Sequence, residues 1–209
     1  MKSEILTRIQ QLGGNIDQVD GQSLQADLQA ITFSTVLYPR PENTQWATAD
    51  DTEPIYGLGE FMDENRALFT ADPTAFYQKI TDHFYQKTVE PHGQMFFRND
   101  LFTPFREGTA DYDDWNQDFS EPGAVDLSEV YKITGDKTPD FICLAYSYRF
   151  PDNYYICLSD PHPENPTVFG TDHEVFFSEV TNEGTLEAFF QRFMTKEELL
   201  EIVRKRLEK

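Results

Sequence analysis

The chain has little cysteine, little positive charge and no long apolar run. Its 209 residues include only Cys143 and Cys157, and 17 Lys and Arg stand against 37 Asp and Glu, which gives a net charge of −20. No run approaches the roughly 18 apolar residues of a membrane span, and the N-terminus has no apolar signal core. We therefore expect a soluble, cytoplasmic protein with reduced thiols. The two cysteines fall on neighbouring predicted strands of one hairpin, where a disulfide remains geometrically conceivable.

Sequence patterns that carry chemistry are also missing. The histidines form no i, i+4 pair, and no Cys-x-x-Cys or Gly-x-Ser-x-Gly motif occurs. Both cysteines lie inside apolar runs, where a thiol is usually an inert core residue. The acidic run DYDDWNQDF lacks the glycine and glutamate that a calcium loop requires. We therefore expect no catalytic residue, no metal and no cofactor.

The net charge has two interpretations. General acidity keeps a protein soluble and repels nucleic acid and anionic lipid, so we expect neither as a partner. An acidic face suited to a basic partner would give the same net charge.

The 18 Phe and ten Tyr supply enough apolar area for a globular core. We expect one domain over residues 1–209, with an acidic aromatic insertion or long loops at about 39–126.

Hydrophobic periodicity predicts helices toward both ends of the chain and short strands between them. Helices are expected over residues 2–12, 23–31, 73–88, 186–194 and 195–207. Strands are expected at Phe33–Tyr38, Gln94–Arg98, Ser128–Thr134 and Phe141–Tyr148, and at the later runs NYYICLS, TVFG and EVFF, with a hairpin at Arg149–Asp152.

Two segments show no clear period. Pro41–Glu64 has seven acids and no Lys or Arg, and we expect a long ordered loop there with one short strand at Pro54–Leu58. Asn99–Glu129 has nine acids against the single Arg106, with aromatics interleaved, and is expected to be an insertion or an extended loop.

The densest part of the second segment holds Asp111, Tyr112, Asp113, Asp114, Trp115 and Asp118. A solvated acidic surface, a protein-binding surface and a metal or catalytic site all remain open for it. The mixture favours binding over chemistry, because aromatic rings supply contact area and aspartates complement Lys and Arg.

The order of motifs from residue 128 to residue 194 resembles the SUKH superfamily, which includes bacterial toxin-immunity proteins and a fungal cell-wall-synthesis regulator. The matching stretches are Tyr155–Asp160 (YICLSD), Pro166–Phe169 (PTVF) and Gly184–Phe190 (GTLEAFF). The resemblance implies an α+β fold in which helices pack on an antiparallel sheet of about six strands. It also implies a binding role without catalysis.

The first hypothesis is an immunity protein that neutralises a cognate toxin by direct binding. Nuclease toxins are basic because they hold a polyanion, so an acidic inhibitor fits them. The chain would act as a monomer or a weak homodimer. The residues above, with Trp46 and Tyr56, are the candidate partner-binding residues. A regulatory scaffold of the fungal type is the alternative, and a carboxylate-based hydrolase with a pocket lined by Trp46 and Tyr56 is the third.

Overall fold

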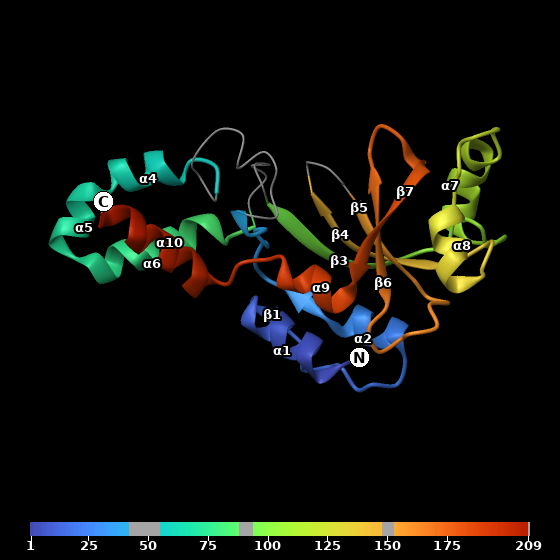
Figure 1. The fold of residues 1–209 in the computed structure, drawn as a ribbon, viewed down its shortest axis with the longest axis horizontal. Helices are drawn as coiled ribbons and strands as arrows, with labels where there is room; N and C mark the ends of the chain where they lie inside the picture. Colours follow the sequence, from blue (N-terminus) through green and yellow to red (C-terminus); the bar gives the residue numbers. More distant parts are fainter. Residues whose placement is uncertain (42–54, 88–93, 148–152, 209) are drawn as a thin grey trace.

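A five-stranded antiparallel sheet forms the centre of the computed structural model, which describes residues 1–41, 55–87, 94–147 and 153–208. Its strands are β3 (Met95–Phe102), β4 (Phe141–Ser147), β5 (Asn153–Cys157), β6 (Thr167–Asp172) and β7 (Phe176–Thr185). They lie in chain order, so β3 and β7 are the edges (Figure 1). The α+β class with an antiparallel sheet, which the resemblance implied, is confirmed.

The sheet is buried on both faces, and the strands show it by alternation. On β5, Tyr154 and Ile156 belong to one core, whereas Tyr155 and Cys157 belong to another. Successive side chains of a strand point to opposite faces, so a strand covered on both sides is a continuous apolar run. The sequence stretch NYYIC has this pattern for that reason.

Three helices cover the first face: α1 (Ser3–Gln11), α2 (Leu24–Ala30) and α9 (Leu186–Gln191). Ile5 and Ile9, one turn apart on α1, are fully buried in the core with Phe189 of α9. The short strands β1 (Gly14–Asn15) and β2 (Thr32–Phe33) pair between α1 and α2. The strand expected at Phe33–Tyr38 is therefore mostly wrong, because beyond Phe33 the chain makes only isolated bridges.

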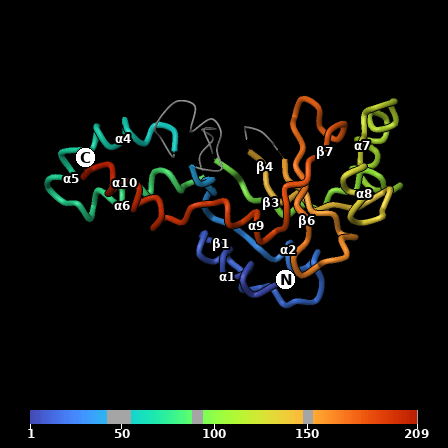
Figure 2. Tube along the Cα trace, in the orientation of Figure 1, coloured from blue at the N-terminus to red at the C-terminus, as the bar shows by residue number. Residues whose placement is uncertain are grey.

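A helical lobe extends from one end of the sheet (Figure 1). It consists of α4 (Leu58–Glu64), α5 (Arg66–Ala71), α6 (Pro73–Phe84) and α10 (Lys196–Leu207). Phe76, Ile80 and Leu199 are fully buried in its core. The C-terminus lies in this lobe, whereas the N-terminus lies below the sheet (Figure 2).

The second face of the sheet is covered by α7 (Ala110–Phe119) and α8 (Ser128–Thr134), which lie at the opposite end of the molecule from the lobe (Figure 1). Val130 of α8 is fully buried against Phe141 and Phe169 of the sheet. The chain reverses after α8 at Gly135, whose φ of 69° favours glycine because it has no Cβ.

Three sequence predictions are wrong, each because a short helix replaces another element. The expected loop at Pro41–Glu64 ends in α4, so the strand at Pro54–Leu58 is absent over its described residues, 55–58. The expected extended segment Asn99–Glu129 contains the helix α7, and the expected strand Ser128–Thr134 is α8. β-Branched residues suggested a strand for α8, but Val130 and Ile133 are spaced for one face of a helix.

The helix expected over 73–88 ends earlier, at Phe84, because the chain leaves it at Tyr85. Trp46 and the hairpin at Arg149–Asp152 lie outside the described residues. Among the helices that the structure describes, none combines the length and apolar character needed to cross a bilayer.

Candidate functional site

The helix α7 is fixed to the end of β3 by its first turn. Thr109 is the N-cap: its Oγ1 accepts a hydrogen bond from the backbone N–H of Tyr112 at 3.2 Å. One carboxylate oxygen of Asp111 accepts from both the backbone N–H and the hydroxyl of Thr103, at 2.8 and 3.1 Å. These bonds set the direction of α7 across the sheet, so Asp111 has a structural role.

The inner side of α7 presents rings to the β6–β7 hairpin. The Trp115 ring lies 4.8 Å from the Phe176 ring and 5.4 Å from the Phe119 ring, measured between centroids. Phe119 and Phe176 lie 6.0 Å apart, so the three rings form a cluster. Because contacts of this kind add stability beyond the area they bury, they hold α7 against the hairpin.

The hairpin tip has an unusual backbone. Phe176 has a φ of +42°, which is the left-handed region that a bulky side chain rarely adopts. Asp172 accepts from the backbone N–H of Glu174 at 2.7 Å, and the N–H of Ser178 donates to the carbonyl of Val175 at 3.0 Å. This tight turn directs Phe176 toward Trp115 and leaves Val175 41% exposed.

Between α7 and the hairpin tip lies an open groove with a volume of about 470 Å³. Its lining combines aromatic and acidic side chains with a small turn after the helix: Trp115, Asp118, Phe119, Glu121, Pro122, Gly123, Ala124, Glu174, Val175, Phe176 and Ser178. The three carboxylates come from both walls, two from the end of α7 and one from the hairpin. We call this hollow the α7–hairpin groove.

The carboxylates of the groove have no counter-charge among the residues that the structure describes. None of Asp118, Glu121 and Glu174 forms an ion pair within the part of the chain that the structure describes. Arg106, the one basic residue between residues 99 and 129, is paired with Asp140. The groove is therefore free to accept a cation from outside.

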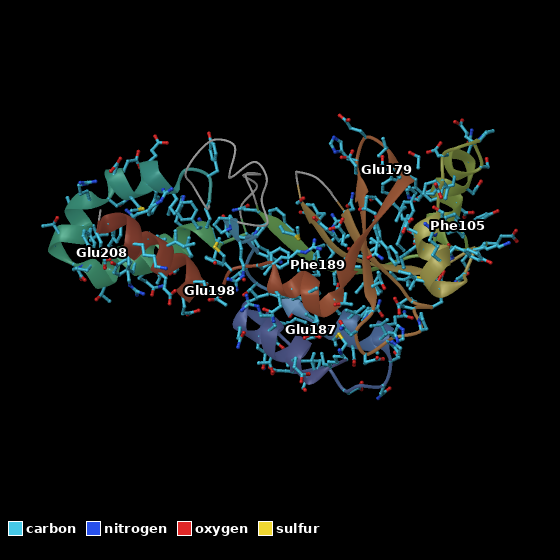
Figure 3. The ribbon with its side chains drawn as sticks, in the orientation of Figure 1. Phe105, Glu179, Glu187, Phe189, Glu198 and Glu208 are labelled. Atoms are coloured by element: carbon cyan, nitrogen blue, oxygen red, sulfur yellow. The ribbon has the colours of Figure 1, made fainter. Side chains whose placement is uncertain are left out.

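A second hollow of about 360 Å³ borders the same hairpin and shares Glu174 and Val175 with the groove. Gly170 and Thr181, which pair between β6 and β7, line this second hollow. Along each strand, the adjacent residue points the other way and belongs to the core under α7. The second hollow therefore lies on the other face of the sheet. Asp172, Glu179 and Glu183 also line it, so both sides of the hairpin are acidic. Glu179 is labelled on the hairpin in Figure 3.

The structure brings together only some of the predicted residues. Trp115 and Asp118 line the α7–hairpin groove, whereas Asp113 and Asp114 are exposed on α7 outside it. Tyr112 is half-buried and does not line the groove.

Tyr56 is 63% exposed but precedes α4 in the helical lobe, at the other end of the molecule, so it does not join the groove. Trp46 lies outside the described residues. The groove also depends on Glu121, Glu174 and Phe176, which the sequence did not indicate. Residues 173–175 form the turn of the hairpin, and only the fold places this turn beside α7.

The ionisable groups with raised pKa values lie in the interior. Burial raises the pKa of the Cys143 thiol to about 11, although Arg98 partly opposes this shift, so the thiol is protonated and unreactive at neutral pH. Cys143 pairs with Tyr155, and Cys157 pairs with Phe141, so the two cysteines are diagonal rather than opposite, and both are free. Among the described residues, no three His, Cys, Asp or Glu side chains are grouped as metal ligands.

Comparisons of this chain with protein families, curated proteins and solved structures give no match. The molecule is an α+β protein with an acidic aromatic groove at one end of its sheet. The resemblance to the SUKH superfamily rests on the sequence motifs alone.

Proposed function

We propose that this chain is a binding protein without catalytic activity, and that it holds a basic protein partner in the α7–hairpin groove. The observation that carries the proposal is the composition of the groove: three clustered rings and three carboxylates, with no Lys, Arg or His among its eleven lining residues. Rings provide the anchoring contact area of protein interfaces, and charges without a partner select the sign of what binds.

The wider surface supports the same partner. Residues 99–129, which include α7, have nine acids and one Arg, and residues 160–183, which include the hairpin, have six acids and no Lys or Arg. Like charges concentrated at one end of a molecule raise the association rate of an oppositely charged partner. The groove therefore lies where a basic protein would be drawn first.

We further propose that the partner is a toxin, most simply a nuclease, and that binding neutralises it. The motif resemblance supports this choice, and so does the net charge of −20. A nuclease must present Lys and Arg to its polyanionic substrate. A protein that places carboxylates and rings on that surface competes with the substrate directly.

The test compares two double variants that remove the same charge from the same helical region. Asp118→Asn with Glu121→Gln changes the groove, whereas Asp113→Asn with Asp114→Asn changes the exposed surface of α7 outside it. Each is produced with the toxin encoded beside the gene of this chain. We measure rescue of growth and, with purified proteins, the Kd by calorimetry.

We expect the groove variant to bind about tenfold more weakly and to lose rescue, because tenfold corresponds to about 1.4 kcal/mol and a close charge pair that the bound partner covers contributes at least that much. The surface variant should stay within about threefold, since exposed pairs contribute less. Equal losses in the two variants would reject the groove. A neighbouring gene product that is neither bound nor inhibited would reject the immunity role.

A further inference from the structure

Arginine side chains that lie over aromatic rings approach the ring centres more closely than the lysine side chains do. The guanidinium of Arg98 is 4.2 Å from the centre of the Tyr146 ring, and that of Arg204 is 5.0 Å from the Tyr77 ring. The ammonium groups of Lys79, Lys137 and Lys196 lie 5.6 to 5.8 Å from their rings. A planar guanidinium approaches a ring face more closely than a strongly hydrated ammonium does.

The rings of the α7–hairpin groove are arranged for such an approach. The Trp115 plane is inclined by 30° to that of Phe176 and by 39° to that of Phe119, and Phe119 and Phe176 are also inclined by 39°. The three planes are thus closer to parallel than to perpendicular. Each of the three rings is only partly buried and lines the groove, so a planar cation that enters it meets ring surface with the acidic walls beside it.

The acidic walls match the edge of a guanidinium. Asp118 and Glu121 come from the end of α7, and Glu174 comes from the facing hairpin. A guanidinium has five N–H donors in one plane and pairs with carboxylates through two parallel bonds, whereas an ammonium acts as a point charge. The C-terminal end of α7 adds the negative end of the helix dipole at the same place.

We infer that the α7–hairpin groove is a subsite for an arginine side chain of the partner and discriminates against lysine. This inference rests on the proposed function, because it names the group that the basic partner inserts. The guanidinium stacks on the ring cluster around Trp115 and pairs with carboxylates of both walls. A hollow of about 470 Å³ is at the small end of binding pockets, which suits single side chains rather than a folded element.

The probes are three fluorescein-labelled peptides of ten residues in which glycine alternates with arginine, lysine or citrulline. Citrulline keeps the planar shape of arginine without its charge. Fluorescence anisotropy with the full chain gives each Kd at low salt. We expect the arginine peptide to bind at least about tenfold more tightly than the lysine peptide, and the citrulline peptide to show no binding.

Variants separate stacking from charge. Trp115→Leu, which keeps apolar bulk without a π face, should reduce the arginine-to-lysine ratio to about one, with circular dichroism to verify folding. Asp118→Asn with Glu121→Gln should weaken the binding of both peptides. Asp113→Asn with Asp114→Asn, the charge-matched control outside the groove, should leave the ratio unchanged.

The outcomes distinguish this inference from the proposed function. Equal affinity for arginine and lysine peptides, lost in the groove variant, would overturn the arginine selectivity and leave a basic partner in place. A ratio that Trp115→Leu does not change would also overturn it, as would the absence of groove-dependent binding to any peptide. Arginine selectivity without rescue from the toxin would instead keep the subsite and reject the immunity role.

Discussion

Phe176 shows how one residue can carry both strain and contact area. Its φ of +42° costs about 1–3 kcal/mol for a side chain with a Cβ. Its ring lies against Trp115 and Phe119, and these contacts offset the cost. The strained turn is thus held by the rings that line the groove, so the groove wall and the hairpin backbone depend on each other.

This coupling predicts an inverted order of stability at position 176. Phe176→Ala and Phe176→Gly lose the same ring, but only alanine retains a Cβ at positive φ. We expect both variants to be destabilised and the glycine variant to be more stable than the alanine variant by about 1 kcal/mol. Urea unfolding of the two proteins measures the difference.

The neighbouring Phe177 is the control. It is 1% exposed, and its φ lies outside the positive range. Phe177→Gly should therefore be less stable than Phe177→Ala by about 0.5–1 kcal/mol, which is the usual order for residues of a strand. The same order at both positions would show that Phe176 carries no backbone strain.

At the scale of elements, helices that carry their own start signals could be predicted from the sequence. Thr195 and Glu198 form the capping box of α10, with each side chain bonded to the other residue's backbone N–H. Asp72 and Pro73 begin α6 in the same local way. These helices were predicted to within a few residues because the information lies inside the segment.

The helix α7 and the groove could not be predicted in the same way. Tyr112, Trp115 and Phe119 are spaced for one face of a helix, but each is only partly buried, and acids occupy much of the rest of the helix. The ring that completes the cluster, Phe176, follows more than fifty residues later. A pairing between distant segments leaves no local pattern, so Trp115 and Asp118 were predicted as binding residues without the hairpin that faces them.

Glu198 links α10 to α1 and to the segment around Arg40, and it makes stability depend on pH. Its carboxylate pairs with Arg8 of α1 at 3.4 Å and with Arg40 at 2.5 Å. Partial burial opposes its ionisation, but the backbone N–H of Thr195 and the guanidinium of Arg40 outweigh this effect and lower its pKa. A lowered pKa in the folded state stabilises the protein above the pKa of about 4.3 in unfolded chains, and this contribution disappears as the pH falls through the folded value.

We therefore predict that Glu198→Gln, which keeps a residue suited to the capping box, lowers the free energy of unfolding by about 1 kcal/mol at pH 7. The estimate is modest because a third of the side chain is exposed. At pH 3 the difference in stability between the variant and the natural chain should be smaller than at pH 7, because protonation removes the contribution of the carboxylate. Urea unfolding at both pH values measures this. Glu201→Gln, an exposed charge on the same helix, is the control and should have little effect at either pH.

At the scale of the whole molecule, charge is polarised along the long axis. The helical lobe at one end is nearly neutral, because residues 55–87 and 195–208 have nine acids and seven Lys and Arg (Figure 1). The acids of α7 and the β6–β7 hairpin lie at the other. The proposed basic partner would therefore be oriented before contact, so that the acidic end meets it first. Long-range steering and contact in the groove then act at different stages of binding.

This separation predicts different kinetic effects for the two double variants. Asp113→Asn with Asp114→Asn removes charge outside the groove and should lower the association rate about two- to threefold with an unchanged dissociation rate. Asp118→Asn with Glu121→Gln removes groove contacts and should raise the dissociation rate about fivefold or more. Surface plasmon resonance with the purified toxin at 50 and 300 mM salt measures both rates.

The effect of Asp113→Asn with Asp114→Asn on the association rate should fade at high salt, because screening shortens the range of charge interactions to a few ångströms. If both variants changed only the association rate at every salt concentration, the groove carboxylates would act by steering alone and would make no bound contact.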